Sequence, residues 1–253
     1  MDYIENLRQI VSTLPQPKVF TARINFMQHV CDALKSGNLP KYRFPTFELS
    51  ESEIENYLRS NMTDDESKFQ QMVETLQNFD KQLSEFRTYL QVRFGYWATI
   101  TDNLMDSWVK LFPDRKYLEL MAGNGYISKG LRDRNMSVVC TDNLSWSAQS
   151  KTGETRITDI EQLDALSAIK KYHDQVDSVV LAWSPDRDEI DFEILKEIRK
   201  FNLEFFVIGE EYGATNSKKF WDSINVIKNP EIDELNQVYS QYDLVNDKIF
   251  LIQ

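Results

Sequence analysis

Hydrophobic residues in the first half of the chain recur every three or four positions, which is the spacing of one face of an α-helix. Stripes of this kind run over residues 4–14, 24–34 and 69–94. The segments 50–53 and 63–66 each place a hydroxyl three residues before a glutamate, as a capping box at the start of a helix does. We therefore predict an all-α N-terminal domain over residues 1–111.

From Lys116 onward the pattern changes to short apolar runs separated by amphipathic segments of helix length. The apolar runs are 117–122, 137–142, 176–183, 203–209 and 248–253. The intervening helices are expected at about 126–135, 160–173, 189–201 and 216–225. This alternation predicts an α/β domain over residues 112–253, with a parallel sheet covered by helices on both faces. Ligands of such sheets bind beyond the carboxyl ends of the strands, so we look for chemistry there.

The overall charge of the chain disfavours one class of partner. The chain has 253 residues, with 29 Lys and Arg against 40 Asp and Glu, and its net charge is −11. An excess of acid disfavours nucleic acid as a partner, because binding to phosphate backbones depends on basic side chains. Only Cys31 and Cys140 are present, and without a paired cysteine or histidine they predict neither a disulfide framework nor a metal site.

The apolar runs and the cysteine usage also predict the cellular compartment of the protein. The sequence shows no basic, apolar leader and no run of about 18 apolar residues of the kind that spans a membrane. We therefore expect no membrane association, and a reducing cytoplasm fits the cysteine usage best.

The first predicted strand ends in a turn that contains Gly123 and Gly125. Two glycines between a strand and a helix let the backbone come close to a ligand. A dinucleotide fingerprint would need a third glycine where Ser128 stands, and the Gly-Lys-Ser/Thr of a phosphate loop is absent from the sequence. The pattern therefore disfavours both NAD and ATP, and a simple tight connection remains the alternative.

Two further acids follow predicted strands. Asp142, with Asn143 after it, comes about twenty residues beyond the glycine pair, where an acid can accept hydrogen bonds from ribose hydroxyls. Asp159 and Ile160 follow the short run 155–157, where an acid beside an apolar residue can bind and cover a purine. The alternatives are a solvated loop acid for Asp142 and a helix N-cap for Asp159. Taken together, the features predict a nucleoside pocket.

On these residues the chain resembles the class I S-adenosylmethionine-dependent methyltransferases, in a poorly characterised branch, over about residues 92–253. The first strand of that family leads into acid-x-Gly-x-Gly-x-Gly. Glu119, Gly123 and Gly125 match this motif, and Met121 replaces its first glycine. The resemblance implies a Rossmann-like domain with a mostly parallel, seven-stranded sheet, and S-adenosylmethionine as the cofactor.

The resemblance also assigns roles to residues. It implies that Asp142 binds the ribose and that Asp159 with Ile160 contacts the adenine. Aromatic residues before the first strand and after the fourth would form the pocket wall. The complete cofactor-binding set that we predict is Tyr96, Trp97, Glu119, Met121, Ala122, Gly123, Asn124, Gly125, Tyr126, Asp142, Asn143, Asp159, Ile160 and Trp183.

The fourth strand ends in the segment 183–186, which looks like the substrate-facing, proline-containing loop of many methyltransferases. Methyl transfer is an in-line displacement that needs positioning more than a fixed catalytic triad. A base is needed only for a protonated acceptor, and the candidates are Asp186 and Glu210. The helical domain would then serve as a substrate cap or bind a partner.

We expect a methyltransferase acting on a small-molecule or protein acceptor. One alternative is a nucleic-acid methyltransferase, which the loop around Pro185 supports and the net charge opposes. Another is a non-catalytic methyltransferase-like module that acts through its helical domain, an option kept open by Met121 in the glycine motif.

Overall fold

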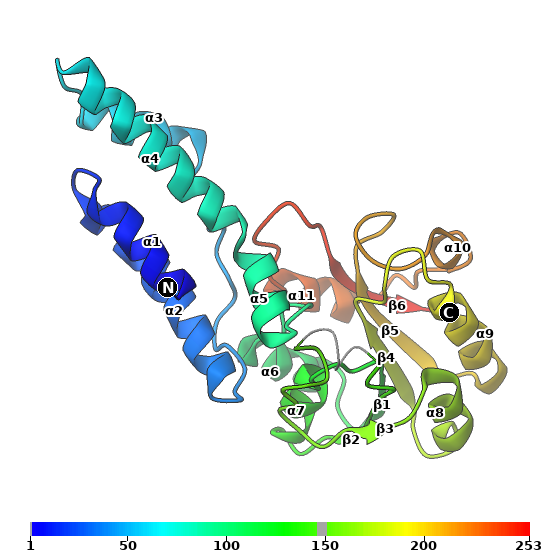
Figure 1. The fold of residues 1–253 in the computed structure, drawn as a ribbon. Helices are drawn as coiled ribbons and strands as arrows, with labels where there is room; N and C mark the ends of the chain where they lie inside the picture. Colours follow the sequence, from blue (N-terminus) through cyan, green and yellow to red (C-terminus); the bar gives the residue numbers. More distant parts are fainter. Residues whose placement is uncertain (1, 146–150) are drawn as a thin grey trace.

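The computed structural model describes residues 2–145 and 151–253. Before the first strand, the regular elements of the described chain are all helical. They are α1 (Tyr3–Ser12), a 3-10 helix (Pro17–Phe20), α2 (Thr21–Lys35), α3 (Glu51–Ser60), α4 (Glu66–Ser84), α5 (Phe86–Phe94) and α6 (Asp102–Leu111). Figure 1 shows that α1 to α4 form an arm that extends away from the sheet, whereas α5 and α6 lie against the α/β part.

One of the two predicted capping boxes is confirmed. At the start of α3, the backbone N–H of Glu53 donates to the Ser50 hydroxyl (3.3 Å), and the Glu53 carboxylate accepts from the Ser50 N–H (2.8 Å). The second prediction was wrong, because Asp65 caps α4 by accepting from the Lys68 N–H at 3.1 Å. An acid directly before the first turn satisfies the same free amides without a hydroxyl.

The second part of the chain forms a mixed α/β layer structure. Its sheet has the strand order β3-β2-β1-β4-β5-β6, with all neighbours parallel except β5 and β6. The strands are β1 (Lys116–Leu120), β2 (Ser137–Asp142), β3 (Glu161–Gln162), β4 (Ser178–Ala182), β5 (Glu204–Gly209) and β6 (Lys248–Ile252). The helices are α7 (Tyr126–Arg132), α8 (Ala165–Tyr172), α9 (Ile190–Phe201), α10 (Lys218–Trp221) and α11 (Pro230–Val238). The predicted mostly parallel α/β arrangement is thus confirmed.

The sheet has six strands in the described part of the chain, not the predicted seven. At the expected seventh position, Val226 forms only an isolated antiparallel bridge with Ile252, and the Ile227 N–H donates to the Leu251 carbonyl at 2.9 Å. Pro230 begins α11 shortly afterwards and has no N–H for a ladder. The segment is therefore too short to extend into a strand.

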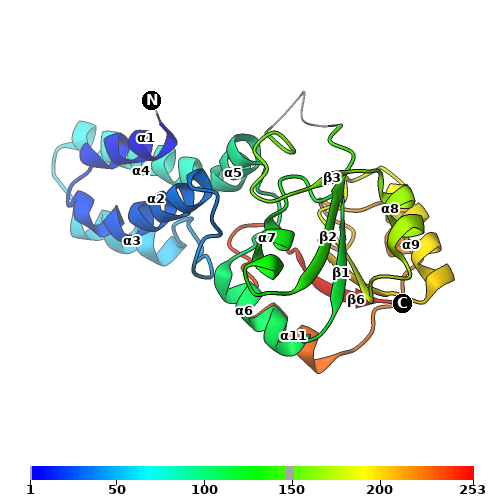
Figure 2. The ribbon, with the colours of Figure 1, turned by 90° about the horizontal axis from the view of Figure 1, so that it is seen from below.

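Two apolar clusters cover the two faces of the sheet. Helices α8 and α9 lie on one side of the sheet, and α6, α7 and α11 lie on the other (Figure 2). The cluster on the second side continues without interruption into the N-terminal helices. Within the described ranges, none of the helices combines the length and the hydropathy needed to cross a bilayer.

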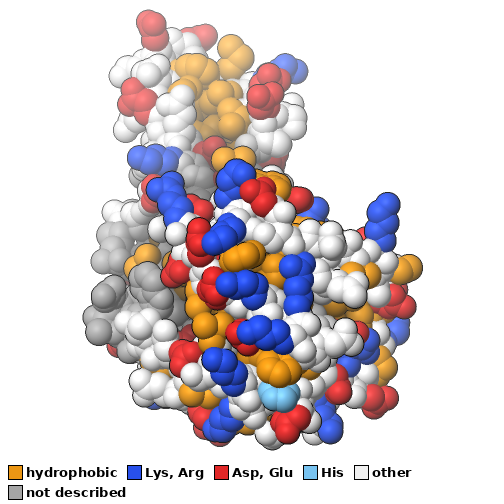
Figure 3. Space-filling model, turned by 90° about the vertical axis from the view of Figure 1, so that its right-hand side faces the viewer, with side chains coloured by type: hydrophobic (Ala, Val, Ile, Leu, Met, Phe, Trp, Pro, Cys, Tyr) orange, Lys and Arg blue, Asp and Glu red, His pale blue; other side chains and the backbone are white. Residues whose placement is uncertain are grey.

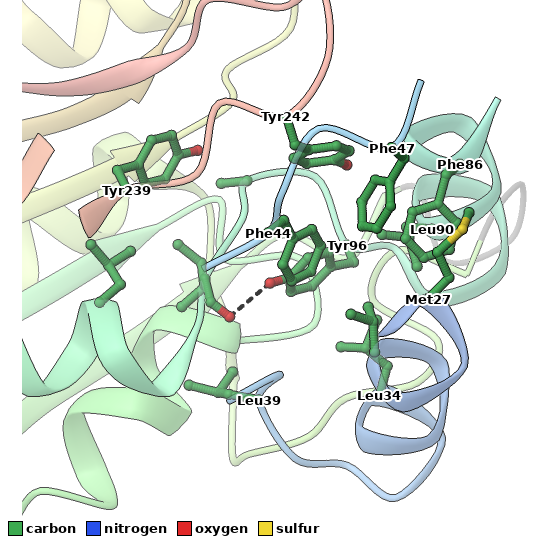
Figure 4. Packing of buried hydrophobic residues seen from close by; sticks show 14 of the residues in the cluster. Met27, Leu34, Leu39, Phe44, Phe47, Phe86, Leu90, Tyr96, Tyr239 and Tyr242 are labelled. Carbon is green, nitrogen blue, oxygen red and sulfur yellow. Dashed lines mark hydrogen bonds between the residues drawn. The ribbon is translucent and has the colours of Figure 1, made fainter. Parts of the chain in front are cut away.

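The continuous cluster is dense in aromatic rings where the helical arm meets the sheet (Figure 4). The ring of Phe44 lies 6.0 Å from that of Phe47 and 5.2 Å from that of Tyr242, measured between centroids. Tyr96 is buried among them and donates its hydroxyl to the Ile100 carbonyl at 2.7 Å. The domain division at residue 111 stays a prediction, because the described helical segments and the sheet share this core.

Candidate functional site

A cavity of about 470 Å³ opens at the carboxyl ends of β1, β2 and β4. The strand order reverses between β1 and β4, and such a switch point is where open α/β sheets bind their ligands. The volume lies within the range of small-molecule sites. The segments that line the cavity include part of 95–100, the turn 121–123, residues 142 and 143, residues 163–165, and the loop 182–186.

The turn after β1 brings backbone to the cavity wall. Gly123 has a φ of 59°, the left-handed conformation that glycine adopts without strain. Met121, where the resemblance expects a glycine, adopts the same conformation with a φ of 53°. For a residue with a side chain this costs about 1–2 kcal/mol. The turn 121–123 after β1 therefore contains two left-handed residues, one of which is not glycine.

Asp142 joins the turn after β1 to the end of β2. One carboxylate oxygen accepts from the Gly123 N–H at 2.8 Å, and the other accepts from the Leu144 N–H at 2.6 Å. The side chain lines the cavity, and 8% of the residue is exposed. Since each carboxylate oxygen can accept more than one hydrogen bond, both remain able to accept from ligand hydroxyls.

Glu119 also lines the cavity, from the end of β1. It is 3% exposed, and one of its oxygens accepts from the N–H (2.8 Å) and the hydroxyl of Ser128. Burial raises the pKa of its carboxyl to about 7, although the bonds from Ser128 act in the opposite direction. The environment of this acid thus favours the neutral form more than water does.

Two indole rings lie next to each other in the wall of the cavity. The rings of Trp97 and Trp183 have centroids 6.0 Å apart and are inclined by 45°. Trp97 donates its Nε1–H to the Thr152 hydroxyl at 2.9 Å, and Trp183 donates to Asp247 Oδ2 at 2.7 Å. These hydrogen bonds fix both rings, so the aromatic walls are formed before any ligand arrives.

Ten of the sixteen predicted site residues line the cavity, and six do not. The ten are Trp97, Glu119, Met121, Ala122, Gly123, Tyr126, Asp142, Asn143, Trp183 and Asp186. The six are Tyr96, Asn124, Gly125, Asp159, Ile160 and Glu210.

Asn124 holds loops together instead of facing the cavity. Its side-chain amide is fully buried and donates to the carbonyls of Phe94 (2.7 Å) and Lys151 (2.9 Å). Its oxygen accepts from the Gly153 N–H at 2.6 Å. Gly125, next to it, is the N-cap of α7, and a Cβ there would lie 2.7 Å from Thr158 Cγ2.

The third strand lies later in the chain than the sequence predicted. Asp159 and Ile160 precede β3 and line a separate, more open cavity of about 800 Å³. The residues that follow β3 and reach the predicted pocket are Leu163 and Asp164. Asp164 also caps α8 by accepting from the Ser167 N–H at 2.9 Å. The signal for this position was the spacing of an N-cap acid before the apolar stripe of α8.

The two candidate bases have different positions. Glu210 does not line the cavity, and its two oxygens accept from the N–H groups of Ala214 (2.7 Å) and Asn246 (2.8 Å). Asp186 lines the cavity with a side chain that is 43% exposed, and Arg187 donates to it at 3.1 Å. Only Asp186 is therefore placed to exchange a proton with a ligand.

The structure adds lining residues that the sequence analysis did not identify. Ser184 and Asp188 belong to the loop after β4, and Thr152 and Ala214 come from loops distant in sequence. Ser184 falls within the loop 183–186 that the sequence analysis indicated, whereas no sequence motif marks the other three positions. Among the residues that the structure describes, no group of three or more His, Cys, Asp or Glu side chains is arranged to hold a metal ion.

Comparisons with known proteins give only distant likenesses. The sequence matches no known protein family, and no curated protein is significantly similar to it. Among solved structures, the fold is similar to that of monomeric WbdD (8% identity, 59% of this chain and 38% of the other, TM-score 0.34). It is also similar to a variant of MtNAS in complex with S-adenosylmethionine (10% identity, 99% and 96%, TM-score 0.38).

A third similar structure is human N-acetylserotonin methyltransferase in complex with SAM (12% identity, 91% of this chain and 67% of the other, TM-score 0.36). The chain spans less than half the length of WbdD.

Proposed function

We propose that this protein is a methyltransferase of the class I type that uses S-adenosylmethionine and acts on a small-molecule or protein acceptor. The observation that carries the proposal is the arrangement around Asp142. This acid follows β2, accepts from the Gly123 N–H of the turn after β1, and borders a cavity at the switch point of the sheet. Such an acid binds the ribose hydroxyls of a nucleoside in this kind of fold.

The residues present fit an adenosyl cofactor. The turn 121–123 would hold its amino acid part, and Asp142 would bind its ribose. Leu163 and Asp164 occupy the place beside β3 where an apolar side chain and an acid can cover and bind a purine. When bound, the cofactor supplies a methyl group on a positively charged sulfur.

The protein's own contribution is to position the acceptor and to exclude water. Trp97 and Trp183 limit where an acceptor can lie, and their hydrogen bonds hold them in place without a ligand. A preformed wall of this kind lowers the entropy lost on the way to the transition state. Asp186, in the loop after β4, accepts the proton of a protonated acceptor.

Isothermal titration calorimetry of the full chain tests this proposal. S-adenosylmethionine and S-adenosylhomocysteine are expected to bind, and NAD and ATP are not. Asp142→Ala is expected to weaken binding by about 1–3 kcal/mol, because hydrogen bonds to the ribose are lost. Asp159→Ala is the matched control, since Asp159 is an exposed acid outside this cavity and its loss leaves affinity unchanged.

Two results would contradict the proposal. The first is the absence of binding by both adenosyl ligands. The second is equal affinity of the chain and its Asp142→Ala variant, which would place any adenosyl ligand elsewhere.

A further inference from the structure

The ionisable side chains that line the described part of the cavity are all acids. Of its described lining residues, five are acidic and none is Lys, Arg or His. The acids are Glu119, Asp142, Asp164, Asp186 and Asp188. Asp142 and Asp164 are assigned to the cofactor and burial favours the neutral form of Glu119, so Asp186 and Asp188 are the acids that remain for an acceptor. They repel an anionic acceptor and attract a cationic one.

The chain does not lack basic side chains elsewhere. Figure 3 shows Lys and Arg side chains gathered on the outer face of the α/β part, where α9 and α10 lie. Both helices carry basic residues in their last turns: Arg199 and Lys200 in α9, and Lys218 and Lys219 in α10. The cavity lining therefore lacks the basic side chains that the outer face carries.

Ser184 provides an independent observation at the same place. It lines the cavity between Trp183 and Pro185, it is 1% exposed, and its hydroxyl has no hydrogen-bond partner. Buried hydroxyls are nearly always paired, so Ser184 leaves an unsatisfied hydrogen-bonding group in the wall of the cavity, which a ligand can satisfy. A hydroxyl oxygen accepts hydrogen bonds from an N–H group.

The indole pair adds a surface that suits a flat, apolar group close to a positive charge. Aromatic faces attract cations as well as apolar groups. Arg87 already uses this property, because its guanidinium carbon lies 5.0 Å from the Trp183 ring centroid. Arg87 itself is paired with Asp243 through bonds of 2.5 and 3.0 Å, so it offers no free positive charge to an anionic acceptor. Arg187, which pairs with Asp186, is exposed to solvent and does not line the cavity.

We propose that the acceptor is a small amine carried on a flat apolar group, which enters the cavity as an ammonium ion. The apolar group lies against Trp97 and Trp183, and the nitrogen is directed toward Ser184 and Asp186. This inference depends on the proposed function and names the class of its acceptor. Because the cofactor and the acceptor share a cavity of about 470 Å³, the acceptor is small.

In the proposed reaction, proton transfer from the ammonium precedes methyl transfer. The Asp186 carboxylate takes one proton from the ammonium and leaves a neutral amine with a lone pair. The nitrogen forms a bond to the methyl carbon while the carbon–sulfur bond breaks, and sulfur keeps that electron pair. The products are a methylated ammonium ion and a neutral thioether, and the proton on Asp186 passes to water.

Three indoles that differ only in charge test the inference. Tryptamine carries an ammonium, 3-ethylindole is neutral, and indole-3-propionate carries a carboxylate. Each is titrated calorimetrically into the full chain saturated with S-adenosylhomocysteine at pH 7.5. Tryptamine is expected to bind at least tenfold more tightly than 3-ethylindole, and indole-3-propionate more weakly than either.

Two variants test whether Asp186 is responsible for the preference for tryptamine. Asp186→Asn is expected to reduce the affinity for tryptamine about tenfold and to leave that for 3-ethylindole unchanged. Asp174→Asn is the matched control, because Asp174 is exposed beyond the end of α8 and outside the cavity lining. Thermal melting of each variant shows that the fold is intact.

Equal or tighter binding of indole-3-propionate would overturn the inference, and so would the failure of all three indoles to bind a chain that binds S-adenosylhomocysteine. Failure of S-adenosylhomocysteine itself counts against the proposed function instead. In that case the indoles are titrated into the free chain, where a preference for tryptamine supports the acceptor class and its absence refutes it.

Discussion

Glu119→Gln is expected to change how the stability of the protein depends on pH. Burial raises the pKa of Glu119 to about 7, against an ordinary value of 4.5. The folded state therefore binds the proton more tightly than the unfolded state does. The contribution of this group to stability is complete below pH 4.5 and is lost as the pH rises through 7. At 1.36 kcal/mol for each pKa unit, the loss amounts to about 3 kcal/mol.

Glutamine keeps an oxygen that can accept from Ser128 but does not titrate in this range. Urea unfolding of both proteins at pH 5 and pH 8 isolates the effect, because the other groups titrate alike in both. Between these pH values, the free energy of unfolding of the original chain should fall by about 2–3 kcal/mol more than that of Glu119→Gln. Glu211→Gln, at an exposed position, is the matched control and should follow the original chain. Parallel pH profiles of the original chain and Glu119→Gln would refute the reasoning.

Two further predictions concern stability. Gly95→Ala should lower the free energy of unfolding by about 1–3 kcal/mol, because the φ of Gly95 is +58° and a Cβ there would lie 2.6 Å from Asn124 Nδ2. Urea unfolding measures this change, and an unchanged urea midpoint would contradict the prediction. Arg87→Met should cost about 3–5 kcal/mol in the same assay, since it leaves the buried carboxylate of Asp247 and the partly buried one of Asp243 without their cation. Adding Asp247→Asn should restore part of that loss, and a purely additive double variant would argue against the ion pair.

The strand ends that the sequence located correctly are those that follow long apolar runs. Asp142 is such a case, because the run 137–142 is long enough to be recognised and β2 matches it. Asp159 is the opposite case. Strand β3 consists only of Glu161 and Gln162, which carry no apolar pattern, so its position depends on pairing with β2 rather than on local sequence.

Other features of the site depend on contacts between distant segments. Trp97 and Trp183 were each predicted as pocket wall, but their mutual contact follows from the sheet order and from hydrogen bonds to Thr152 and Asp247. Glu210 follows β5 as predicted, and it is bound by the Asn246 N–H from a loop far along the chain. No pattern of neighbouring residues reveals such partners.

The apolar cluster that connects the helical arm to the sheet bears on how the chain can be divided. The pattern of the sequence changes near residue 111, yet buried residues such as Met27, Phe47 and Tyr96 belong to one cluster with Phe206 of β5. Cutting the chain at that point would expose apolar surface on both fragments and invite aggregation. We therefore expect the arm and the sheet to lose their structure cooperatively, although the pattern of the sequence changes between them.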